Sequence, residues 1–174
     1  MPCPTDFERL CGTWSLVSWE RFRAGRLLEH PLGQQPVGLL TYDPAGFVQV
    51  QTMARYRTLE VFRNPRDAAN AGLRGATLSG EQAGELVEAY ASFAGYAGTF
   101  EIEESQPLIR HHLWTGIDPG MVRRVQERLY RFIGEEGLEL RIKPYLVDGV
   151  EHDDALVWQR AKTGNTPERE GAGR

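Results

Sequence analysis

The apolar side chains of this chain recur mostly at every second residue, in short runs separated by Gly, Pro and Asp residues. This period predicts strands with one buried face, because successive side chains of a strand point to opposite sides. Residues 12–22 form the first run, and residues 38–53 contain two strands joined at Asp43–Gly46, where proline and glycine favour a tight turn. Further runs cover 98–104, 107–114, 125–133, 138–144 and 155–160. The sequence therefore predicts an all-β protein with a meandering antiparallel sheet.

One segment has a helical period instead. Ser79 and Gln82 have the spacing of a capping box, in which each side chain bonds the backbone N–H of the other residue at the start of a helix. Apolar side chains then recur every three or four residues, at Ala83, Leu86, Val87, Tyr90 and Ala94. We predict one α-helix over about 80–94, inserted between two groups of strands, where it could close one end of a barrel.

The length of the chain, 174 residues, is enough to bury a core without disulfide or metal support, and we expect one domain over 1–161. Residues 162–174 contain no aromatic or large aliphatic side chain and are expected to form a disordered tail. No apolar run approaches the roughly 20 residues that span a bilayer. The N-terminus also lacks a basic leader followed by an apolar segment, so we expect a cytoplasmic protein without a membrane anchor.

Charge and motif content exclude several classes of partner. The net charge of −4 disfavours binding to nucleic-acid phosphates. Cys3 and Cys11 are close together in sequence and are expected to be free thiols. The sequence contains no CxxC pair, no HExxH segment, no GxGxxG segment and no P-loop. We therefore expect neither a structural metal nor a bound cofactor, and any catalysis would be cofactor-free.

Several short segments together resemble the lipocalin-like domain family of bacterial and fungal single-domain proteins. The resemblance covers about residues 7–160 and is carried by Gly12-Thr13-Trp14, LVSWE at 16–20, Pro31-Leu32-Gly33, Pro36, GLLTYDPAG at 38–46, YAGTFE at 96–101, His111-His112 and Trp158-Gln159-Arg160. It implies a calycin-type antiparallel barrel of eight to ten strands, with a cavity for small, mostly apolar molecules. In many cases it also implies an association with polyketide or other secondary-metabolite pathways. The family has no settled catalytic residues, so none is transferred to this chain.

The first strand supplies two candidate residues. If residues 12–22 alternate regularly, Trp14 and Glu20 share a face with Leu16, Ser18 and Phe22, while Trp19 points outward or into an interface. Trp14 would then fill the closed end of the barrel and contribute to ligand binding. Glu20 would lie at the cavity mouth, either paired with an arginine at the solvated rim or acting as a catalytic carboxylate.

The second candidate is His111, which shares a face with Ile109 and Leu113. Apolar neighbours favour the inward direction, where an imidazole can bind a ligand or act as an acid or base near neutral pH. A structural histidine bonded to a neighbouring strand is the alternative. His112 lies beside Trp114 on the other face, so the reverse orientation also remains open.

The third candidates are Arg128 and Tyr130, which alternate with Gln126 and Phe132. If this face points inward, Arg128 and Tyr130 would hold a carboxylate, enol or phenolate oxygen in a cavity also lined by Tyr42, Tyr96 and Phe100. The alternative places the arginine on the solvated outer wall. The next strand has a clear inward face, formed by Leu138, Leu140 and Ile142.

Two functions are consistent with these residues. One is a binding module for a small apolar or weakly acidic molecule, for example a polyketide-type intermediate. The other is a cofactor-independent isomerase, cyclase or dehydratase, in which the cavity folds such a molecule and one acid–base residue moves a proton. A homo-oligomeric state is left open.

Overall fold

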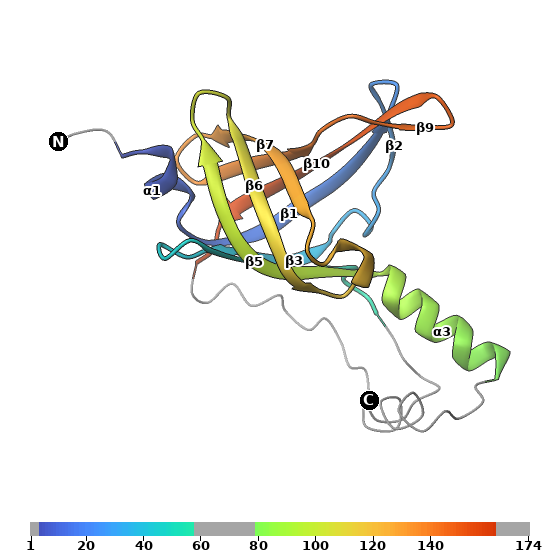
Figure 1. The fold of residues 1–174 in the computed structure, drawn as a ribbon. Helices are drawn as coiled ribbons and strands as arrows, with labels where there is room; N and C mark the ends of the chain where they lie inside the picture. The colour runs from blue at the N-terminus through green and yellow to red at the C-terminus, as the bar shows by residue number, and fades with distance from the viewer. Residues whose placement is uncertain (1–3, 58–78, 163–174) are drawn as a thin grey trace.

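The computed structural model describes residues 4–57 and 79–162, which form ten strands and three helices (Figure 1). The helices are α1 (Asp6–Leu10), α3 (Gly80–Ala91) and the short 3-10 helix η1 (Pro119–Met121). The strands are β1 (Gly12–Arg23), β2 (Arg26–Glu29), β3 (Val37–Tyr42), β4 (Phe47–Met53), β5 (Phe93–Glu103), β6 (Leu108–Gly116), β7 (Val125–Ile133), β8 (Gly137–Ile142), β9 (Tyr145–Val147) and β10 (Val150–Arg160). The predicted tail lies almost entirely outside the described residues.

Eight of the strands close into an antiparallel barrel. Each neighbouring pair is hydrogen-bonded in the order β1-β3-β4-β5-β6-β7-β8-β10, and β10 pairs again with β1 to complete the ring. Strands β2 and β9 flank the long β1–β10 pair outside this ring. The predicted all-β antiparallel barrel is confirmed. The short strands β2 and β9 were not predicted, because every side chain in them is exposed and neither has an apolar–polar alternation.

The turn predicted at Asp43–Gly46 joins β3 to β4. The Gly46 N–H donates to the Asp43 carbonyl oxygen over 2.8 Å, and the Ala45 N–H donates to the Asp43 carboxylate over 2.8 Å. Gly46 has a φ of 89°, which a residue without a Cβ adopts at little cost. The turn sets the register in which Tyr42 pairs with Val48.

The short helix α1 closes one end of the barrel. The Trp14 indole N–H donates to the Leu10 carbonyl oxygen over 2.9 Å, and Phe7 stacks on Phe100 at a centroid distance of 5.5 Å. The Tyr130 hydroxyl donates to the Asp6 carboxylate over 2.7 Å. The buried core lies against this helix, so the apolar interior is filled at the α1 end.

Arg160 ties the last strand to this closure. Its guanidinium lies over the Trp14 ring at 3.7 Å and donates to the carbonyl oxygens of Arg9 and Cys11 over 2.6 Å and 2.8 Å. These contacts satisfy carbonyls that the end of a short helix leaves without partners. Cys11 is a free thiol, as expected, whereas Cys3 lies outside the described residues.

The predicted helix over 80–94 is present as α3, but it does not close the barrel. Its capping box is confirmed, since the side chains of Ser79 and Gln82 each accept from the other residue's backbone N–H. The helix ends at Ala91 and has no buried residue, and Val87 and Tyr90 are exposed. In Figure 1, α3 extends away from the end of the barrel opposite α1. Across residues 4–57 and 79–162, no helix has the length and apolar character needed to cross a bilayer.

A β-bulge in β1 overturns the regular alternation expected for residues 12–22. Leu16 pairs with Trp158 and Ser18 pairs with Val157, so Val17 is an extra residue without a partner on β10. After the bulge, the residues on the cavity side are Trp19 and Arg21. The placement of Trp19 on the outer face, and of Glu20 on the face of Trp14, was therefore wrong.

Deletion of Val17 provides a test of this bulge. Without Val17, the residues Trp14, Leu16, Trp19 and Arg21 fall at a strict period of two, so all four keep their inward direction without the extra residue. We expect the Val17 deletion to fold with a free energy of unfolding within about 1 kcal/mol of the parent, as for a change at an exposed site. Val17 is itself 49% exposed.

The matched control is deletion of Ser15, which precedes the bulge. This deletion puts Trp14 and Leu16 on opposite faces of the strand. Either Trp14, which is fully buried, or Leu16 would then face solvent. We expect a loss of several kcal/mol, of the order seen when a large core side chain is removed. Urea unfolding followed by circular dichroism measures both variants, and equal losses would contradict the assignment of the bulge.

Candidate functional site

A cavity of about 390 Å³ occupies the end of the barrel away from α1. In β1, β5 and β7 the core residues against α1 lie toward one end of the strand, and the cavity residues lie toward the other. Much of the wall is apolar and comes from Val50, Phe93, Leu140, Ile142, Leu156 and Trp158. The volume is within the range of small-molecule sites in proteins.

The mouth of the cavity is formed by segments that follow the strands. Tyr90 and Ala91 come from the last turn of α3, and Ile117, Asp118 and Met121 come from the connection between β6 and β7. Helix α3 therefore contributes only its C-terminal end to the site.

One side of the cavity carries a neutralised cluster of polar groups. The Asp154 carboxylate, 1% exposed, accepts from the Trp19 indole over 2.8 Å and from two nitrogens of Arg21 over 3.0 Å each. The Tyr145 hydroxyl donates to the same carboxylate over 3.3 Å, and Glu29 accepts from Arg21 over 2.7 Å. Because the cation and the anion are paired, this cluster offers little net charge to a ligand.

Arg128, in contrast, is a buried cation without a carboxylate partner in the part of the chain that the structure describes. Only 8% of its surface is exposed, and it lines the cavity from β7. One terminal nitrogen donates to the Glu127 carbonyl oxygen over 2.9 Å and to the Gln126 side chain over 3.4 Å. Within the ranges 4–57 and 79–162, Arg128 forms no ion pair. Buried charges are normally paired, so this one favours an anionic ligand.

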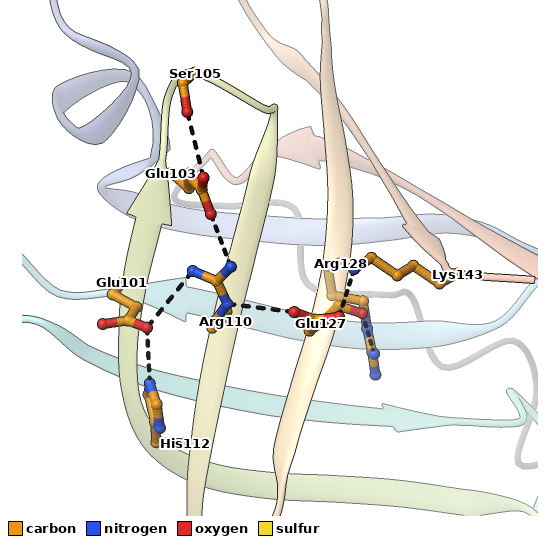
Figure 2. A network of polar contacts seen from close by, with 8 residues as sticks. All are labelled: Glu101, Glu103, Ser105, Arg110, His112, Glu127, Arg128 and Lys143. Carbon is orange, nitrogen blue, oxygen red and sulfur yellow. Dashed lines mark hydrogen bonds and ion pairs between the residues drawn. The ribbon is translucent and has the colours of Figure 1, made fainter.

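The outer wall of the neighbouring strand β6 carries an arginine that, unlike Arg128, has several carboxylate partners. Arg110 contacts the carboxylates of Glu101, Glu103 and Glu127 at 3.8, 2.7 and 3.2 Å (Figure 2). Glu127 also contacts Lys143, and His112 lies 3.3 Å from Glu101. In Figure 2, Arg128 points away from this chain of ion pairs. The alternation in β7 therefore places Glu127 outside and Arg128 inside.

His111 lies behind the cavity wall, between two tyrosines. Its Nε2 is 2.8 Å from the Tyr42 hydroxyl, and its Nδ1 is 2.8 Å from the Tyr96 hydroxyl. Burial lowers the pKa of the His111 imidazole well below its usual range, and Arg128 and His112 lower it further. Burial also raises the pKa of both tyrosines. At neutral pH the three groups are therefore uncharged.

Two of the predicted ligand-binding residues, Tyr96 and Arg128, line the cavity. The others belong to the buried interior rather than to the cavity wall, namely Trp14, Tyr42, Phe100 and Tyr130 in the core cluster, and His111 behind Tyr96. Glu20 lies on the opposite face of β1 from Trp19 and Arg21, and it is not among the cavity residues. The inward directions of His111 and Arg128, both left open by the sequence, are established by their burial.

The sequence interpretation missed Trp19, Arg21 and Asp154. A signal existed for Asp154, since it shares the alternation of Leu156 and Trp158, whose face is apolar. For Trp19 and Arg21 the bulge at Val17 reversed the expected faces. In the part of the chain that the structure describes, no three His, Cys, Asp or Glu side chains gather in a way that could hold a metal ion.

A sequence model described as a lipocalin-like domain matches residues 11–161. No curated protein sequence matches the chain. A solved structure described as a redesigned β-barrel is similar to the chain with 12% sequence identity and a TM-score of 0.38, and the alignment covers 90% of this chain and 95% of that one.

Proposed function

Because this chain belongs to the lipocalin-like domain family, we propose that it binds a small, mostly apolar molecule with an acidic group in the cavity at the α3 end of the barrel. A polyketide-type or other secondary-metabolite intermediate fits this description, since such molecules combine apolar carbon skeletons with acidic oxygens. The cavity volume and its apolar wall support the apolar part of the ligand.

The observation that carries the proposal is that Arg128 is buried and forms no ion pair with the described residues. An ionised guanidinium loses hydration when it is buried, and it recovers that loss only through hydrogen-bonded or charged partners. Arg21 in the same cavity has such a partner in Asp154. Arg128 has only neutral acceptors among the described residues, so an anionic oxygen of a ligand would complete its contacts.

Two fluorescent probes that differ by one charged group test this proposal. The anionic probe is 1-anilinonaphthalene-8-sulfonate, and the neutral probe is N-phenyl-1-naphthylamine, which lacks the sulfonate. We expect both probes to enter the cavity and to quench Trp19 and Trp158, which lie in its wall, with tighter binding of the anionic probe. Absence of binding by either probe would contradict a ligand cavity, and equal binding would contradict the acidic ligand.

A second candidate function is a cofactor-independent isomerase, cyclase or dehydratase. It is supported by the contact between His111 and Tyr96, because a neutral imidazole can exchange a proton with a tyrosine that borders the cavity. Under this proposal, His111→Phe abolishes turnover while probe binding persists. Analysis for a chemically changed product after incubation with a bound molecule separates this function from simple binding.

A further inference from the structure

The hydrogens of the Tyr42–His111–Tyr96 group can be placed by counting donors and acceptors. A neutral imidazole has one N–H and one acceptor nitrogen, and each tyrosine hydroxyl has one hydrogen to donate. Tyr42 is fully buried. In the described part of the chain, the acceptor within reach of the Tyr42 hydroxyl is His111 Nε2. If Tyr42 donates to Nε2, the His111 Nδ1–H must donate to the Tyr96 oxygen.

The opposite arrangement leaves a buried hydrogen without an acceptor. If Tyr96 donated to Nδ1, the Nε2–H would donate to Tyr42, and the Tyr42 hydrogen would point into an apolar surrounding that includes Phe100, 4.7 Å away between ring centroids. An unsatisfied buried donor costs about 1–3 kcal/mol, which is enough to select the first arrangement. In that arrangement the Tyr96 hydrogen has no acceptor in the group, and Tyr96 lines the cavity.

Arg128 lines the same cavity as Tyr96, from β7, and β5 and β7 both pair with β6. Its charge opposes the effect of burial on the pKa of Tyr96 and of Tyr42. A guanidinium only donates hydrogen bonds, so it cannot accept the Tyr96 hydrogen. The cavity wall thus presents a cation and an oriented hydroxyl donor together.

From this geometry, and resting on the proposed function, we infer that the cavity binds weak oxygen acids such as phenols and enols as their oxyanions, held between the Arg128 guanidinium and the Tyr96 hydroxyl. Tyr42 and His111 are positioning residues, because they direct the Tyr96 hydrogen toward the ligand. On binding, the O–H bond of the acid breaks and its proton passes to bulk water. A ligand group that can only donate hydrogen bonds is rejected.

The other ionisable groups around the cavity do not cancel this preference. Arg21 and Asp154 form an ion pair, and Tyr145 donates to the same carboxylate. Asp118 and Tyr90 lie at the mouth, where Asp118 accepts from the Gly120 N–H over 2.8 Å. Behind Tyr96, His111 is neutral, and His112 faces Glu101 on the outer wall. The net charge deep in the cavity is therefore that of Arg128.

The test uses 4-nitrophenol, whose phenol and phenolate forms absorb at different wavelengths. Absorbance is titrated against pH for the dye alone and for the dye saturated with the full chain. We expect the midpoint of the bound dye to lie about two pH units lower, which corresponds to roughly hundredfold tighter binding of the phenolate than of the phenol. The methyl ether 4-nitroanisole, which cannot ionise, should bind correspondingly more weakly than the phenolate.

Tyr96→Phe should remove about one pH unit of this displacement, the size expected for one hydrogen bond to a charged group. Tyr130→Phe is the control, since its hydroxyl bonds to Asp6 outside the cavity, and it should keep the parent displacement. A displacement unchanged in Tyr96→Phe would overturn the role of Tyr96. If that variant fails to fold, the comparison of 4-nitrophenol with 4-nitroanisole in the parent protein still decides the inference.

The outcomes also separate this inference from the proposed function. If the parent protein binds neither 4-nitrophenol nor the sulfonate probe, the proposed function fails. If it binds both, and the bound dye ionises at the same pH as the free dye, the proposed function stands and the oxyanion site is overturned.

Discussion

Replacement of Arg128 by leucine is expected to weaken binding of 1-anilinonaphthalene-8-sulfonate by about 1.5–3 kcal/mol, or roughly 10- to 150-fold in Kd. The loss follows from removal of a charge-assisted hydrogen bond in a cavity that is otherwise largely apolar. Binding of the neutral N-phenyl-1-naphthylamine should stay unchanged, because leucine preserves apolar contact where the stem of Arg128 packs. Fluorescence titration of both probes gives the two Kd values.

Arg131→Leu is the matched control for this variant. Arg131 lies on the same strand, but its side chain is 68% exposed and pairs with Glu139 on the outer wall. It should leave the affinity for both probes at the parent value. A similar loss of sulfonate binding in both variants would point to the overall charge of the protein and would contradict a specific site at Arg128.

Replacement of Asp154 by alanine is expected to lower the free energy of unfolding by about 3 kcal/mol, the lower end of the range for breaking a buried ion pair. The substitution leaves the Arg21 guanidinium and the Trp19 indole without their buried acceptor. Part of the loss is offset because Arg21 keeps Glu29 and is partly exposed. Urea unfolding at neutral pH measures the change.

The neighbouring residue supplies the control. Asp153 pairs with Arg141 at 2.6 Å, and 41% of the Arg141 side chain is exposed, so Asp153→Ala should cost at most about 1 kcal/mol. Equal losses in the two variants would show that the Asp154 cluster adds no more to stability than the partly exposed Asp153–Arg141 pair.

Taken together, the two variants assign separate tasks to the two arginines that line the cavity. Arg21 pairs with the Asp154 carboxylate of the protein itself, so loss of that carboxylate lowers the stability of the fold. Arg128 has only neutral acceptors among the described residues, so its charge is available to a ligand. A cavity that contained only paired charges would show no preference between the two probes.

Several features of this fold were predictable from residues alone. The period of two identified the barrel strands, and the Pro44–Gly46 turn located the β3–β4 hairpin. The apolar neighbours Ile109 and Leu113 favoured the inward direction of His111 without deciding it, and its complete burial establishes that direction. In each case the information is local, because strand pleat and turn geometry depend on residues that are adjacent in sequence.

Other features depended on the tertiary structure. The bulge at Val17 is defined by the register of β1 against β10, more than 130 residues away in the chain, and no feature of residues 12–22 marks it. The closure of the barrel by α1 likewise depends on contacts of Asp6 with Tyr130 and of Arg9 with Arg160. A five-residue helix has too little periodicity to be recognised before those contacts form.

The division of the interior into core and cavity was also decided only in three dimensions. Tyr42, Tyr96 and Phe100 all face inward, as alternation predicts, yet Tyr96 borders the cavity while the other two fill the core. Alternation determines the side of the sheet to which a residue points. Its height along the barrel axis depends on strand register and on which end a helix closes, so the residues available to a ligand emerge only when all eight strands are assembled.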